Sequence, residues 1–201
     1  MKKQTIAVDI DDVLAAETEF IIEFSNKHFG HNLTREEYTE HWGDLWAVDL
    51  EEVERRAELI HEPGNVSSYP LIEGGRDVLE HLKKHYRLVI LTSRRDRLRQ
   101  ETLTWLDQHF PGVFDEVRFT GFFDTLHEDR HLLTKADLLV EMGAEYLIDD
   151  QLKHCIGSAE AGLNVILFGD RATHRDSKLP SNVTRCSNWS QVQEYFDGIR
   201  S

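Results

Sequence analysis

The chain has 201 residues, of which 40 % are hydrophobic, and its formal net charge is −14. This length suffices for one substantial core, so we expect one domain with room for an inserted lobe. The charge argues against a nucleic-acid polymer or an anionic membrane as a partner, because both bind basic surfaces. The negative net charge does not exclude a small anionic substrate, because exposed charges are screened beyond roughly 8–10 Å.

The N-terminal segment and the two cysteines point to a cytoplasmic protein. Acids stand at Asp9 and Asp11, where a secretory signal would carry its apolar run, and no apolar stretch is long enough to span a membrane. Cys155 and Cys186 lack the spacing of a zinc site or a disulfide framework. We interpret both as small buried side chains.

Five short runs rich in β-branched and apolar residues have the length of strands. They cover residues 5–10, 88–91, 116–120, 146–148 and 165–168. Amphipathic stretches precede the later runs, at residues 75–85, 98–109, 135–141 and 155–161, and a weaker sixth run at 183–186 is followed by a helix at 191–199. This alternation predicts an α/β fold, a Rossmann-like, doubly wound parallel sheet with helices on both faces.

Local signals at the predicted helix ends support this interpretation. Thr134 is a suitable N-cap before Lys135, and Gly143 is a suitable left-handed residue at the end of the same helix. Thr34, with Glu37 three residues later, predicts another helix start.

The interval between the first and second runs, residues 13–87, is far longer than the dozen or so residues that a crossover needs. It contains helical patterns and no strand pattern. We expect residues 17–69 to form a small helical cap, and residues 1–16 and 70–201 to form the core. The cap helices would bury the apolar positions Phe20, Ile21, Phe24, Phe29, Val53, Ala57 and Ile60.

Polar side chains gather where the predicted strands end, and in an open α/β sheet this edge binds ligands. Carboxylates crowded at one edge repel each other strongly, and a divalent cation relieves that repulsion. Oxygen ligands without His or Cys suit Mg²⁺. The residues concerned are Asp9, Asp11 and Asp12 after the first run, Thr92, Ser93 and Arg94 after the second, Asp149 and Asp150 after the fourth, and Lys135 before it.

Taken in order, these motifs resemble those of the haloacid dehalogenase-like superfamily, and the match spans the chain. Within it, the chain is similar to the 5′(3′)-deoxyribonucleotidases and bacterial nucleotidase-like proteins, because the cap follows the first motif, the second motif reads Thr-Ser and the fourth is Asp-Asp. The resemblance implies the strand order 5-4-1-2-3. The chain departs from it at Asp12, where many relatives carry Gly, and at Arg94.

The resemblance also implies catalytic roles. Asp9 would be the nucleophile that forms an aspartyl-phosphate, and Asp11 would protonate the leaving alcohol and then activate water. Thr92 would bind the transferring phosphoryl group and Lys135 would balance its charge. The metal ligands would be Asp9, the backbone carbonyl of Asp11 and Asp149, with Asp150 behind Asp149.

The predicted substrate contacts leave alternatives open. Phe20, Trp42 and Trp46 would stack on a nucleobase, or the two tryptophans would form one helix face packed into the cap. Ser93 would bind substrate. Arg94 and Arg95 would pair with a carboxylate or phosphate of the substrate, or they would lie exposed at the start of a helix. The histidine pair His127 and His131 reads as solvated loop residues rather than as metal ligands.

The leading hypothesis is therefore a magnesium-dependent phosphomonoesterase, a 5′-nucleotidase acting on nucleoside or deoxynucleoside monophosphates. One alternative keeps the enzyme and changes the substrate to a sugar phosphate or another small phosphorylated metabolite. Another is a metal- and phosphate-binding module without turnover. Because relatives are often dimers, the resemblance also allows a homodimer.

Overall fold

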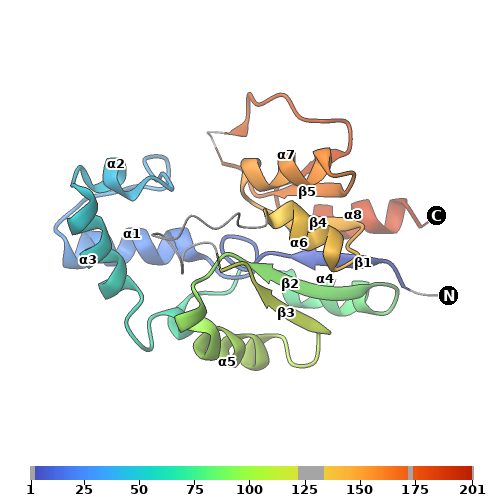
Figure 1. Cartoon of the computed structure of the whole chain (residues 1–201), viewed down its shortest axis with the longest axis horizontal. Coiled ribbons are helices and arrows are strands. Elements are labelled where there is room, and N and C mark those ends of the chain that lie inside the picture. Colours follow the sequence, from blue (N-terminus) through green and yellow to red (C-terminus); the bar gives the residue numbers. More distant parts are fainter. Residues whose placement is uncertain (1–2, 122–133, 172–173, 201) are drawn as a thin grey trace.

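A six-stranded parallel sheet forms the centre of the molecule (Figure 1). The computed structural model describes residues 3–121, 134–171 and 174–200, so His127 and His131 lie outside the described residues. The strand order is β3-β2-β1-β4-β5-β6, which confirms the predicted order 5-4-1-2-3 and adds the sixth strand beside β5. The strands are β1 (Thr5–Val8), β2 (Arg87–Thr92), β3 (Glu116–Phe119), β4 (Tyr146–Asp149), β5 (Asn164–Phe168) and β6 (Val183–Cys186).

Helices cover both faces of this sheet, as predicted. Strand residues alternate between the faces, so that Ile6 and Val8 lie in one hydrophobic cluster and Ala7 between them lies in the other. The first cluster lies under α4 (Gly75–Lys83), α5 (Arg99–His109) and α8 (Trp189–Gly198), and the second under α6 (Lys135–Glu141) and α7 (Leu152–Glu160). Cys155 and Cys186 are both buried and unbonded to each other, which confirms their predicted structural role.

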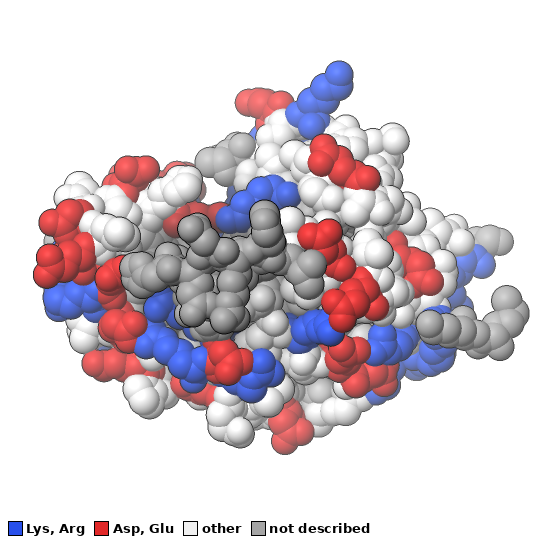
Figure 2. All heavy atoms as spheres, viewed as in Figure 1, with Lys and Arg blue, Asp and Glu red and all other residues white. Residues whose placement is uncertain are grey.

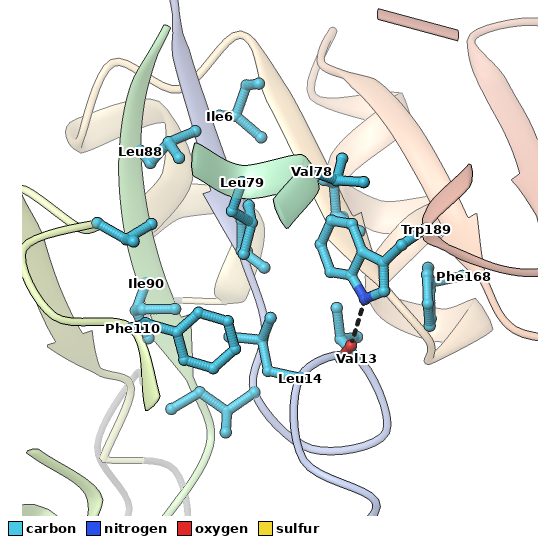
Figure 3. Close-up of a cluster of buried hydrophobic side chains, with 14 of the residues drawn as sticks. Ile6, Val13, Leu14, Val78, Leu79, Leu88, Ile90, Phe110, Phe168 and Trp189 are labelled. Atoms are coloured by element: carbon cyan, nitrogen blue, oxygen red, sulfur yellow. Dashed lines mark hydrogen bonds between the residues drawn. The ribbon is translucent and has the colours of Figure 1, made fainter. Parts of the chain in front are cut away.

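Trp189 connects the last helix to the loop that follows β1. Its indole Nε1 donates a hydrogen bond to the carbonyl oxygen of Val13 at 3.0 Å, and its ring packs on Phe168 with centroids 5.2 Å apart (Figure 3). Gly75 allows this close packing, because a Cβ there would lie 2.9 Å from the indole nitrogen. The buried tryptophan therefore fixes the loop that carries Asp9, Asp11 and Asp12.

Residues 17–60 form α1 (Glu17–His28), α2 (Trp42–Trp46) and α3 (Leu50–Ile60), which lie to one side of the sheet in Figure 1. We call these residues the helical insertion. They share a hydrophobic cluster of their own, built on Ile21, Leu45, Trp46 and Ile60. A short 3₁₀ helix, η1 (Val66–Ser68), follows and packs against α5.

Two of the sequence predictions were wrong in detail. The first strand ends at Val8 rather than at residue 10, because the carbonyl of Ile10 accepts hydrogen bonds from the amides of residues 13–15 and the chain turns there. No helix begins at Thr34. Glu37 does accept hydrogen bonds from the Thr34 amide and hydroxyl, at 3.0 and 2.9 Å, but they close an exposed turn. A cap without an apolar helix face to bury does not nucleate a helix.

The other predicted helix signals are confirmed. Thr134 caps α6 through a reciprocal pair of hydrogen bonds with Asp137, and Gly143 adopts a left-handed φ of 65° after that helix. Within the described residues, no helix combines the length and apolar character needed to cross a membrane. Acidic and basic side chains are interspersed over the face shown in Figure 2.

Candidate active site

The carboxyl ends of β1, β2 and β4 bring the predicted catalytic side chains to one edge of the sheet. Asp9 follows β1, Thr92 ends β2 and Asp149 ends β4. Lys135 is the first residue of α6, which is capped by Thr134. All four of these predicted side chains are buried, so the edge is a closed polar site rather than a solvated turn.

Lys135 lies between two of the acids. Its Nζ is 2.9 Å from Oδ1 of Asp9 and 2.6 Å from Oδ2 of Asp149. Burial disfavours the charged ammonium, but Asp149 and Asp9 outweigh burial and raise the pKa of Lys135 above its ordinary value. The lysine is therefore a fixed positive charge at the position that the sequence assigned to charge balance.

The two acids that contact this lysine form, together with Asp150, a group of three carboxylates with the spacing of a metal site. One oxygen each of Asp9, Asp149 and Asp150 lies within 4.8 Å of the others, and all three residues are buried. Burial raises the pKa of Asp9 to about 6, against the opposing effect of Lys135. Burial also opposes ionisation of Asp149, but Lys135 and His154 hold its pKa below the ordinary value. This buried, oxygen-only donor set fits a hard divalent cation such as Mg²⁺.

Asp11 is held in place by Arg94. The guanidinium binds the Asp11 carboxylate through Nε and Nη2, and its plane lies near the ring of Tyr69, with Cζ 5.3 Å from the ring centroid. The Arg94 side chain is only 3 % exposed, so of the two alternatives for this residue the exposed position at a helix start is wrong. The reason is that Asp11 supplies the buried counter-charge.

Asp12 adopts a backbone conformation that favours glycine, with φ of 54°. Its carboxylate accepts hydrogen bonds from the amide of Thr18 at 2.9 Å and from the Thr18 hydroxyl, and it pairs with Arg171 at 2.6 Å. Through these contacts the Asp12 side chain connects α1 to the loop after β5.

The family model described as 5′ nucleotidase, deoxy (pyrimidine), cytosolic type C protein matches residues 3–197. The chain belongs to this nucleotidase family. It is accordingly a phosphoric monoester hydrolase of the haloacid dehalogenase type, and the predicted family resemblance is confirmed.

Two curated proteins are similar to this nucleotidase-family chain over nearly their whole length. "Putative nucleotidase YqfW" of Bacillus subtilis is 22 % identical and covers 96 % of this chain and 93 % of its own. "Putative 5′(3′)-deoxyribonucleotidase" of Staphylococcus epidermidis is 24 % identical and covers 99 % of both chains.

Solved structures show the same fold. The haloacid dehalogenase-like hydrolase SP0104 of Streptococcus pneumoniae has a TM-score of 0.69 at 16 % identity and covers 96 % of this chain and 98 % of its own. A predicted phosphatase of Clostridium acetobutylicum has a TM-score of 0.67 at 14 % identity and covers 98 % and 100 %.

Two of the three aromatic residues predicted to bind substrate in this nucleotidase-family chain, Trp42 and Trp46, pack into the helical insertion. Trp46 is 2 % exposed, and its Nε1 donates to Ser25 Oγ at 3.1 Å. Trp42 packs against it with ring centroids 5.1 Å apart. Phe20 is partly buried against Tyr69 and Phe24. Of the two alternatives for the tryptophans, the structure supports packing within the cap, because both rings belong to the insertion's hydrophobic cluster.

Three residues near the site were not singled out from the sequence. Glu17 opens α1 beside Asp11 and Asp12, and burial with these acids raises its pKa well above the ordinary value. The hydroxyl of Tyr69 is buried without a hydrogen-bond partner among the described residues, and the same holds for the Oγ of Ser93, which the sequence did single out as a substrate contact. Arg171 follows the carboxyl end of β5, so the same strand-end rule that found Asp149 would have found it.

Proposed function

We propose that this protein is a magnesium-dependent phosphatase of nucleoside monophosphates that works through an aspartyl-phosphate. The observation that carries the proposal is the position of Lys135 between Asp9 and Asp149, with Asp150 beside them. A buried cation and three convergent carboxylates match the charge pattern of a phosphoryl group that is bound together with a metal ion.

In the first half of the reaction, a carboxylate oxygen of Asp9 attacks phosphorus in line. An Asp9 oxygen–phosphorus bond forms as the bond to the leaving oxygen breaks, and Asp11 gives its proton to that oxygen. Thr92 Oγ1 already accepts a hydrogen bond from the amide of Arg94 at 3.2 Å, so its hydroxyl proton is directed toward another acceptor, such as a phosphoryl oxygen.

In the second half, Asp11 takes a proton from water as that water attacks the aspartyl-phosphate, which restores the Asp9 carboxylate and releases phosphate. Arg94 holds Asp11 in place for both proton transfers. When bound by Asp9, Asp149, Asp150 and the backbone carbonyl of Asp11, Mg²⁺ would neutralise charge on the phosphoryl oxygens. Lys135 supplies the remaining positive charge.

The nucleotide is proposed on the strength of family membership over residues 3–197. Residues 17–69 would act as a cap that contacts the leaving group, while residues 1–16 and 70–201 carry the chemistry. The packing of Trp42 and Trp46 in the insertion favours a second candidate, a phosphatase of another small metabolite such as a sugar phosphate, because the Trp46 ring is buried there and the Trp42 ring packs against it.

Phosphate release from a panel of nucleoside monophosphates, deoxynucleoside monophosphates and sugar phosphates tests both candidates. We expect turnover of at least one nucleotide with Mg²⁺, loss of turnover with a chelator, and no turnover by Asp9→Asn. Surface-exposed Asp170, which pairs with Arg175, provides the matched control variant Asp170→Asn, which should keep the native rate. Full activity of Asp9→Asn would rule out the nucleophile, and turnover of sugar phosphates alone would replace the substrate.

A further inference from the structure

The guanidinium of Arg171 contacts carboxylates from three separate parts of the chain. Its Nη2 lies 2.6 Å from Oδ2 of Asp12 and also pairs with Asp150, while its Nη1 lies 3.2 Å from Oε1 of Glu40. Asp12 belongs to the loop after β1, Asp150 follows β4, and Glu40 belongs to the helical insertion. We call these three ion pairs the Arg171 bridge.

The bridge crosses a hollow between the insertion and the sheet domain. This hollow has a volume of about 570 Å³ and lies between the segment at residues 35–41, the start of α7 and the loop after β5. Tyr38, Glu40, Leu152, Ile156, Arg171 and His174 are among the residues that line it. Glu40 connects the insertion to both other walls of this hollow. It pairs with Arg171 in the loop after β5 and, at 3.5 Å, with Lys153 in α7.

On the other side, the insertion contacts the sheet domain through Glu58, which pairs with Arg95 and Arg97. Glu58 is 55 % exposed, and its two partners belong to the segment before α5. These pairs do not reach the acids at the strand ends. Among the ion pairs of the described residues, the Arg171 bridge connects the insertion to Asp150, one of the three carboxylates that could hold a metal ion.

The environment of Arg171 suits a residue that fixes other groups. Its side chain is 18 % exposed, whereas those of Asp12 and Asp150 are 6 % and 3 % exposed, so the buried carboxylates meet their counter-charge in a site largely closed to water. The planar guanidinium has nitrogens on different edges, so it can bind several carboxylates at once in a fixed geometry. A lysine ammonium on its flexible stem would hold them less rigidly. Arg171 pairs with Oδ2 of Asp150, and Asp150 also belongs to the group of three carboxylates that could hold a metal ion.

We propose that Arg171 is a positioning residue with two effects: it orients Asp150 at the metal site, and through Glu40 it sets how closely the helical insertion lies to the carboxyl ends of the strands. The first effect rests on the proposed metal site. The second does not, because the Glu40 contact joins two parts of the fold whatever the site binds.

Glu40→Gln separates the two effects, because it removes the charge from the insertion's ion pairs and leaves Asp12 and Asp150 paired. We expect faster hydrogen exchange of the backbone amides at residues 35–46, a KM raised about threefold or more, a kcat within about twofold of native, and an unchanged Mg²⁺ dissociation constant by calorimetry. Native exchange and native KM in Glu40→Gln would overturn the insertion effect.

Arg171→Met removes both effects at once. We expect the same faster exchange and, in addition, Mg²⁺ binding weakened about tenfold, as for residues that orient metal ligands. Arg171→Lys should regain part of the Mg²⁺ affinity, because it restores the charge without the bidentate geometry. Native Mg²⁺ affinity in Arg171→Met would overturn the positioning of Asp150.

The matched control is Arg175→Met. This arginine belongs to the same loop but pairs with exposed Asp170 and touches neither Glu40 nor the acids at the strand ends. It should behave as native in exchange and in Mg²⁺ binding. If Arg171→Met fails to fold, Arg171→Lys and Glu40→Gln still decide the question. Exchange and calorimetry need no turnover, so a failure of the proposed nucleotidase activity is distinguishable from a failure of this inference.

Discussion

Nη2 of Arg94 lies 2.6 Å from Oδ1 of Asp11, and Nε of the same guanidinium lies 3.1 Å from Oδ2. The proposed proton-transfer group is thus held by a side chain from the loop after the neighbouring strand. Asp11 is 20 % exposed, whereas Arg94 is 3 % exposed. The Asp11 carboxylate is therefore the more exposed group of the pair, and the Arg94 guanidinium is buried behind it.

Replacing this cation should lower both activity and stability. For Arg94→Met we expect kcat to fall by about 10- to 100-fold, because Asp11 loses its fixed orientation, and the free energy of unfolding to fall by about 2–4 kcal/mol. Steady-state kinetics and urea denaturation measure the two effects. The control is Arg95→Met, whose partly exposed pair with Glu58 should cost less than about 1 kcal/mol. Native kinetics in Arg94→Met would contradict the positioning of Asp11.

Asp12→Gly should destabilise the protein even though glycine suits its left-handed backbone. Glycine removes the strain of φ at 54° but leaves the Thr18 amide and hydroxyl and the Arg171 guanidinium without this acceptor. We expect a net loss of about 1–3 kcal/mol in the free energy of unfolding. Asp12→Asn keeps an acceptor and should lose less. Equal urea midpoints for native protein and Asp12→Gly would show that the carboxylate contributes nothing.

Mg²⁺ should stabilise the folded protein, because the three carboxylates converge only in the native state. At a free Mg²⁺ concentration about 100 times the dissociation constant, we expect the free energy of unfolding to rise by about 2.7 kcal/mol. Asp149→Asn should abolish this rise, and Asp170→Asn at the surface should retain it. Urea unfolding with Mg²⁺ or with a chelator makes the comparison, and an unresponsive native protein would contradict the metal site.

His61 should make stability depend on pH. Burial, followed by the nearby Arg97 and Arg95, lowers its pKa to about 4. Between pH 6.5 and 4 the unfolded chain binds a proton that the folded chain does not, so the stability contributed by neutral His61 is complete above pH 6.5 and is lost as pH falls through this window.

The loss between pH 7 and pH 5 should be on the order of 1–2 kcal/mol. Other groups also titrate there, and the raised pKa of Asp9 acts in the opposite direction. The informative quantity is therefore the difference between native protein and His61→Gln in urea unfolding at each pH. Parallel stability curves for the two proteins would show that His61 is not responsible.

The sequence by itself determined the sheet and the composition of the site. Parallel strands place their carboxyl ends at one edge, so the positions of Asp9, Thr92 and Asp149 after separate apolar runs were enough to predict that they meet. The Thr134 cap likewise placed Lys135 at the start of a helix. These predictions depend on periodicity and strand direction, which are local properties of the chain.

Only the tertiary structure decided where the long side chains go. Arg94 binds Asp11, Arg171 joins Asp12, Asp150 and Glu40, and Trp46 fills the insertion rather than the cleft. An arginine can reach several carboxylates, and an indole packs as well in a core as on a ligand. The choice depends on which distant residue supplies the counter-charge or the apolar contact, and that partner is brought close only by the folded chain.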